Sequence, residues 1–253
     1  MPSKSTQKAY LFSHWEGLRN HFYLFLNGGE MNDLHQMRIH MKKIHALVLF
    51  NAYIHGSQEI IRNYKPIKDL FRKAGKIRVL QVNLDILKQD KKENSLFGKK
   101  LNKQIEKKTE GFLKKRKKWS HTIQNTFPNI DSQISNCSEK RFTRYLKTQL
   151  KKAQMEFQKE QFHEARKKIK LVLNLYDLLP KISPDTLKLD LVYLDQLQDK
   201  IGKWNDLKEN IKMIKKKERK NVKLHELKTL TKELKKSKKE FKDSVYLTIG
   251  SLE

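Results

Sequence analysis

Apolar residues recur along this chain with the spacing of an α-helix. Between residues 30 and 54 they stand at Leu34, Met37, Met41, Ile44 and Val48, three or four positions apart. This spacing places them on one side of a helix as a packed seam. No strand pattern competes, so we predict an all-α protein with helices near 8–26, 30–54, 57–73, 76–91, 94–125, 138–154, 157–179, 185–201, 203–217 and 220–247.

The same seam returns 128 residues later. Its second copy consists of Phe162, Ala165, Ile169, Val172 and Tyr176. A repeat at a fixed offset indicates an internal duplication. We therefore expect two pseudo-symmetric helical halves, residues 1–126 and 138–253. A linker at residues 127–137 would join them, where Pro128 suggests a break.

A basic stripe follows each apolar seam. One residue after the seam positions stand His35, Arg38, Lys42 and His45 in the first copy, and His163, Arg166 and Lys170 in the second. Spacings of three and seven keep these side chains on one helix face, roughly 100° from the seam. Cations so close to a core favour a groove or channel. We expect the two stripes to face each other across a central cleft, which is the predicted site.

Further repeat-related positions extend this picture. The stretch from Gly75 to Leu80 corresponds to that from Gly202 to Leu207, and we expect each glycine to end one helical segment and open the next. Heptad-spaced lysines follow in both halves: Lys100, Lys107 and Lys114, then Lys228, Lys235 and Lys242. A solvated outer face is the alternative interpretation of these lysines.

Composition supports helices and a polyanionic partner. The chain has 253 residues with only 9 Gly and 5 Pro, and its formal net charge is +28. Such an excess of like charge opposes compaction, so we expect a polyanion to bind. A single cysteine, Cys137, excludes an internal disulfide framework. Without a signal-like segment or a long apolar stretch, we expect a cytoplasmic protein that makes no use of the membrane.

The residues that suggest enzyme or metal chemistry have simpler explanations. His35, His40 and His45 are spaced by five, which spreads them around a helix, and no ligand set accompanies them. Neither repeat shows a nucleophile–base pair or a carboxylate-held metal. We therefore expect no enzymatic activity, no metal and no cofactor. For His35 and His163, a hydrogen-bonded histidine inside the bundle is the alternative to a ligand contact.

The chain resembles a known family, the CHAD domain, whose name stands for conserved histidine α-helical domain. The resemblance rests on the run from His35 to Ile44, its copy beginning at His163, and the stretch from Leu197 to Leu207. It covers nearly the whole chain, which is identified as a single CHAD-like domain over residues 1–253. The chain departs from the family in having Arg78-Val79 where Arg-Asp is usual, and in replacing arginines by lysines.

The resemblance implies two helical bundles around a basic channel that binds inorganic polyphosphate. A narrow channel would admit a phosphate chain and exclude a duplex, although a nucleic-acid-binding or scaffold protein remains the alternative. Localisation would be cytoplasmic, in association with polyphosphate granules. The predicted polyphosphate-binding residues are His35, Arg38, Lys42, Lys43, Arg78, Lys100, Lys107, Lys114, His163, Arg166, Lys167, Lys170, Lys228, Lys235 and Lys242.

Overall fold

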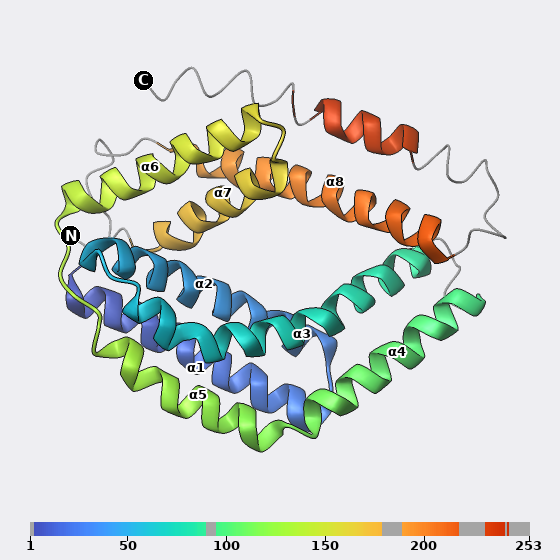
Figure 1. The fold of residues 1–253 in the computed structure, drawn as a ribbon, viewed down its shortest axis with the longest axis horizontal. Coiled ribbons are helices and arrows are strands. Elements are labelled where there is room, and N and C mark those ends of the chain that lie inside the picture. The colour runs from blue at the N-terminus through green and yellow to red at the C-terminus, as the bar shows by residue number, and fades with distance from the viewer. Residues whose placement is uncertain (1–2, 90–94, 179–188, 218–230, 241, 243–253) are drawn as a thin grey trace. The chain divides into compact units, whose positions relative to one another are not determined.

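A computed structural model gives the fold of the chain (Figure 1). It describes residues 3–89, 95–178, 189–217, 231–240 and 242. Every regular element within these ranges is a helix, which confirms the predicted all-α class. The described residues divide into two compact units. Unit 1 contains α1 to α5, and unit 2 contains α6 to α8 together with the helical segment 231–240.

Unit 1 is built from five helices that follow one another along the chain. They are α1 (Lys4–Gly28), α2 (Met31–His55), α3 (Glu59–Gln89), α4 (Leu96–Leu113) and α5 (Arg116–Asp131). Local signals set several of the boundaries. The Ser3 hydroxyl accepts a hydrogen bond from the backbone N–H of Thr6 and caps α1. Gly29 and Gly56 adopt the left-handed conformation that ends α1 and α2.

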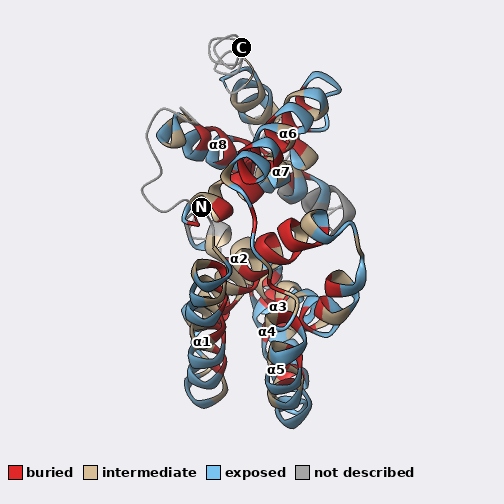
Figure 2. Cartoon of the chain, turned by 90° about the vertical axis from the view of Figure 1, so that its left-hand side faces the viewer, coloured by how far each residue is buried: buried red, intermediate tan, exposed pale blue. Residues whose placement is uncertain are grey.

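Unit 2 contains α6 (Glu139–Gln158), α7 (Phe162–Tyr176) and α8 (Leu191–Lys217). The turn between α6 and α7 includes Glu160, which has a positive φ of 56° although it is not glycine. Helices α7 and α8 pack against each other. Buried residues form stripes along the helices, as Figure 2 shows, so each helix has a core side and a solvent side.

Both predicted apolar seams lie in the core. In α2, all five seam residues from Leu34 to Val48 are buried. In α7, Phe162, Ala165, Ile169 and Val172 are buried, and Tyr176 at the end of the helix is partly exposed. The seams therefore fix which side of α2 and α7 carries the basic stripe.

The chain that follows α5 is tied to α1 and α2 by a polar network. The buried Asn51 side chain donates from Nδ2 to Oε1 of Gln7 over 3.0 Å. Gln7 in turn donates from Nε2 to the carbonyl of Ser135 over 2.7 Å. Residues 127–131 of the expected linker form the last turn of α5, and Pro128 lies inside that helix. The prediction of a break at Pro128 was therefore wrong.

The predicted helix boundaries at two glycines were also wrong. Gly75 lies in the middle of α3, and Gly202 lies inside α8. Conversely, the segment predicted as one helix over 94–125 is two helices, which are separated at Lys114 and Lys115. Among the described residues, no helix is both long enough and apolar enough to cross a membrane.

Candidate functional site

The basic stripe of α2 lies at the edge of the core. His35, Arg38, Lys42 and Lys43 are all half-buried, next to the fully buried seam. Arg78 is half-buried on the neighbouring helix α3, and it is close enough to Arg38 to influence its pKa. We call the set His35, Arg38, Lys42, Lys43 and Arg78 face 1. The structure thus brings two of the predicted site residues, Arg38 and Arg78, close to each other.

Arg38 is anchored to α3 by three contacts. Its Nη1 donates a hydrogen bond of 2.6 Å to the carbonyl of Phe71. Its guanidinium carbon lies 3.9 Å from the centroid of the Phe71 ring. The third contact is with Gly75, where an added Cβ would lie 2.7 Å from Nη1. In an α-helix the carbonyl of residue 71 also accepts a hydrogen bond from the N–H of residue 75. Gly75 therefore lies next to the carbonyl that Arg38 contacts, and the guanidinium occupies the space where another residue would have its Cβ.

Unit 2 repeats this contact at equivalent positions. Arg166 on α7 donates from Nε to the carbonyl of Gln198 on α8 over 2.8 Å. The residue four positions after Gln198 is Gly202, where an added Cβ would lie 2.6 Å from Nη2 of Arg166. In both units, then, the arginine of the basic stripe contacts the next helix where a glycine leaves room.

Gln198 also organises the rest of the basic stripe in unit 2. Lys170 donates from Nζ to Oε1 of this buried glutamine over 3.0 Å. The Nε2 of Gln198 donates to Asp195 over 2.9 Å and to Asp199 over 2.7 Å. We call His163, Arg166 and Lys170 face 2. Two carboxylates, Asp195 and Asp199, therefore lie close to face 2.

Burial and neighbouring charge act on the cations of both faces. Burial, together with a smaller effect of the adjacent Arg78, lowers the pKa of Arg38 to about 10. Burial also lowers the pKa of Lys170, as does Arg166, whereas Asp199 and Asp195 oppose the shift. At neutral pH Arg38 remains positively charged, beside a second cation.

The histidines of the stripes differ from one another. His163 is exposed, and His35 is half-buried. His45 stacks on Tyr64 with ring centroids 5.3 Å apart, and burial, with a smaller effect of Lys68, lowers its pKa to about 4. His45 is therefore neutral at physiological pH. The prediction that it continues the cationic stripe was wrong.

The remaining predicted lysines have varied surroundings. Lys100 and Lys107 are exposed on α4, and Lys114 pairs with Glu110 over 2.6 Å. Lys167 is exposed and pairs with Glu164 over 2.8 Å. A role of these lysines in binding stays a prediction.

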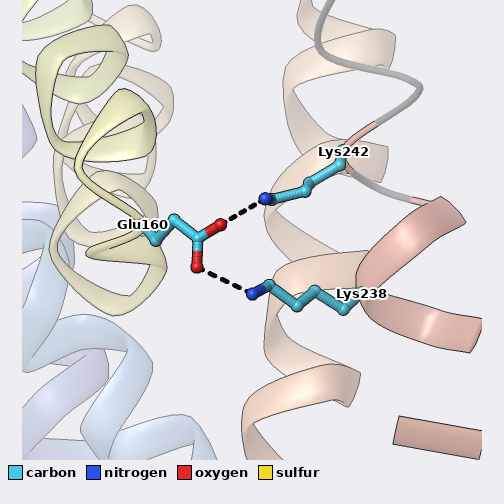
Figure 3. A network of polar contacts seen from close by, with 3 residues as sticks. All are labelled: Glu160, Lys238 and Lys242. Atoms are coloured by element: carbon cyan, nitrogen blue, oxygen red, sulfur yellow. Dashed lines mark hydrogen bonds and ion pairs between the residues drawn. The ribbon is translucent and has the colours of Figure 1, made fainter. Parts of the chain in front are cut away.

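The C-terminal lysines meet an acidic residue within unit 2. Lys242 and Lys238 both form ion pairs with Glu160, the latter over 2.7 Å (Figure 3). These two hydrogen bonds lower the pKa of Glu160 to about 2. Lys235 is exposed, and Lys228 lies outside the described residues.

A cluster of histidines between α1 and α2 was not predicted. The Nδ1 atoms of His14 and His40 are 3.1 Å apart, and His21 stacks on His40 at 5.7 Å. Gly17 makes room for the His40 ring, because a Cβ there would lie 2.2 Å from it. The signal in the sequence was a glycine, Gly17, three positions after His14 and four before His21 in the same helix. Within the described residues, no group of three or more His, Cys, Asp or Glu is arranged to hold a metal ion.

Comparison with known proteins supplies the family. The family model named "CHAD domain" matches residues 9–215. The crystal structure of the CHAD domain from the plant Ricinus communis superposes with a TM-score of 0.67 at 13% sequence identity, covering 98% of this chain and 88% of that one. No curated protein matches the sequence significantly. Because the family model spans most of the sequence, the chain belongs to the CHAD domain family.

Proposed function

We propose that the protein binds inorganic polyphosphate without processing it, through face 1 and face 2. The observation that carries the proposal is that two positively charged side chains, Arg38 and Arg78, lie close together. Both arginines are half-buried, and the like charge of Arg78 lowers the pKa of Arg38. In the described part of the chain, no carboxylate forms an ion pair with either of them. A phosphate chain would relieve this repulsion.

Polyphosphate suits these faces for chemical reasons. It is a uniform chain of negative charges without bases, so closely spaced cations are sufficient for recognition. Hydrogen bonds from Arg and Lys to phosphate are short and charge-assisted, and a nearby apolar wall strengthens them by excluding water. The buried seams of α2 and α7 supply such walls. Membership of the CHAD family adds support, because the family resemblance implies this ligand.

Arg78 and Lys42 provide the sharpest test, because Arg38 also anchors α2 to α3. We expect the R78Q/K42Q double variant to bind fluorescently labelled polyphosphate at least about tenfold more weakly in an anisotropy titration. The slope of log K against log salt should fall by nearly two. The control variant R62Q/K65Q removes the same charges from exposed positions of α3, and it should change affinity less than about threefold. Equal losses in both variants would rule out face 1 as the site.

Competition separates this function from nucleic-acid binding. Unlabelled polyphosphate should displace the labelled ligand at a lower concentration of charge than DNA or RNA does. Equal displacement per charge would favour the nucleic-acid alternative. Incubation of polyphosphate with the protein and Mg²⁺ should leave its chain length unchanged on a gel, since we propose binding and not catalysis. A fluorescent fusion is then expected in the cytoplasm, at polyphosphate granules.

A further inference from the structure

A second basic site lies in unit 1, away from face 1. A pocket of about 190 Å³ is lined by Lys73 and Lys76 of α3, Lys108 and Phe112 of α4, and Lys115 and Trp119 at the start of α5. We call it the α3–α5 pocket. Helix α3 packs against both α4 and α5, and the short break between α4 and α5 brings Lys115 to the rim.

The four lysines of the pocket lack acidic partners. Lys73, Lys76, Lys108 and Lys115 are exposed, and within the described residues none of them pairs with a carboxylate. Their neighbours behave differently, since Lys114 pairs with Glu110 and Arg72 pairs with Asp69. Four uncompensated ammonium groups around one hollow repel each other, and an anion placed among them would remove that repulsion.

The inner wall of the pocket is aromatic. Trp119 is 4% exposed and stacks on Phe112 with ring centroids 6.0 Å apart. Trp119 therefore closes the inner side of the pocket, beneath the lysines that line it. A tryptophan at this place would report on a bound anion through its fluorescence.

The α3–α5 pocket is separate from face 1 because of helix geometry. Lys73 and Lys76 are three residues apart on α3 and share one side of it. Arg78 follows Lys76 by two positions, which corresponds to a rotation of about 200°. Arg78 lies near Arg38 of α2, whereas Lys76 faces α4 and α5. The two sets of cations therefore lie on opposite sides of α3.

We propose that the α3–α5 pocket binds a compact phosphate anion of two or three phosphoryl groups. Such an anion carries several charges in a small volume, which suits four lysines around one pocket. A cavity of about 190 Å³ holds several groups the size of a water molecule, and it is too small for a nucleic-acid duplex. The inference goes beyond the proposed function, because it concerns a different side of α3 and a shorter ligand.

The test measures binding of pyrophosphate to the full-length chain by calorimetry. We expect the K108Q/K115Q variant to bind pyrophosphate at least about tenfold more weakly than the unmodified protein. The matched control is K103Q/K117Q, which removes one exposed lysine of α4 and one of α5, neither of which lines the pocket. It should change the affinity less than about threefold. Equal weakening in both variants, or no binding of pyrophosphate to the unmodified chain, would overturn the proposal.

Two further measurements locate the ligand. Pyrophosphate should change the tryptophan fluorescence of the protein, and W119F should abolish this change while Trp15 and Trp204 remain. R78Q should leave pyrophosphate affinity unchanged, although the proposed function requires that R78Q weaken long polyphosphate. If R78Q weakens pyrophosphate as much as K108Q/K115Q does, the pocket is not a separate site. If R78Q changes the affinity for neither long polyphosphate nor pyrophosphate, the proposed function is wrong, whereas the proposal for the α3–α5 pocket is unaffected.

Discussion

Arg38 and Gly75 are fitted to each other, since a Cβ at Gly75 would lie 2.7 Å from Nη1 of the arginine. The same relationship holds between Arg166 and Gly202, at 2.6 Å. In both units, an arginine of a basic stripe is held by a neighbouring helix at a glycine. Both contacts hold an arginine of the proposed binding faces in place, so a change in the packing of these helices should also change the position of that arginine.

Substitution of Gly75 by alanine tests this relationship. Alanine is normally the better residue in a helix by about 0.5–1 kcal/mol, but here its methyl group would displace the guanidinium of Arg38. We expect G75A to lower the free energy of unfolding by about 1–2 kcal/mol in urea denaturation. The control is G111A in α4, where a Cβ would meet nothing within 4 Å, and it should raise stability slightly. Equal effects of the two substitutions would contradict the fitted contact.

These glycines also show where sequence reasoning reaches its limit. The sequence predicted Gly75 and Gly202 as helix boundaries, because a glycine that ends a helix and a glycine that receives a side chain from another helix look alike along the chain. The apolar seams were predicted correctly since their spacing depends on a single helix. The α3–α5 pocket was missed because its lysines come from α3, from α4 and from the break between α4 and α5, and have no shared period.

His45 should make stability depend on pH. Burial lowers its pKa to about 4 from an ordinary value of 6.5. Between these values the unfolded chain binds a proton at this position and the folded chain does not, so stability rises with pH. The contribution is complete above pH 6.5 and declines as the pH falls toward 4, by as much as about 3 kcal/mol. His40, whose pKa is also lowered by burial, acts in the same direction.

Urea denaturation between pH 4 and 7 checks this expectation. H45F keeps an aromatic ring against Tyr64 and removes the titrating group, so its stability should depend less steeply on pH in this window. The control H121Q changes an exposed histidine of α5 and should leave the slope as it is in the unmodified chain. An unchanged slope in H45F would show that His45 does not titrate as described.

Glu160 should titrate at unusually low pH. Hydrogen bonds from Lys238 and Lys242 lower its pKa to about 2. Because the folded pKa is depressed, the ion pairs stabilise the contact above the ordinary glutamate pKa and are lost as the pH falls through about 2. A carbon NMR titration of the Glu160 carboxyl group measures this directly. K238M/K242M should return the midpoint toward 4.5, whereas K239M, at an exposed neighbouring position, should not.

Lys170 and Lys167 should differ in their effect on polyphosphate binding, although both lie on α7. Lys170 is half-buried and is positioned by Gln198. Lys167 is exposed and already paired with Glu164, and exposed ion pairs of this kind have small energies. We expect K170Q to weaken binding about tenfold and K167Q less than about threefold. Anisotropy titrations at two salt concentrations measure both affinities.

The comparison of these two lysines also tests how face 2 works. If binding depended on net charge alone, K170Q and K167Q would weaken it equally, because each removes one positive charge. If position matters, Q198L should reproduce part of the effect of K170Q, since the Gln198 side chain accepts the hydrogen bond from Lys170. The bond from Arg166 goes to the main-chain carbonyl of residue 198 and remains in this variant. A normal affinity in Q198L, together with a normal circular dichroism spectrum, would mean that the glutamine contributes to folding and not to the orientation of the cations.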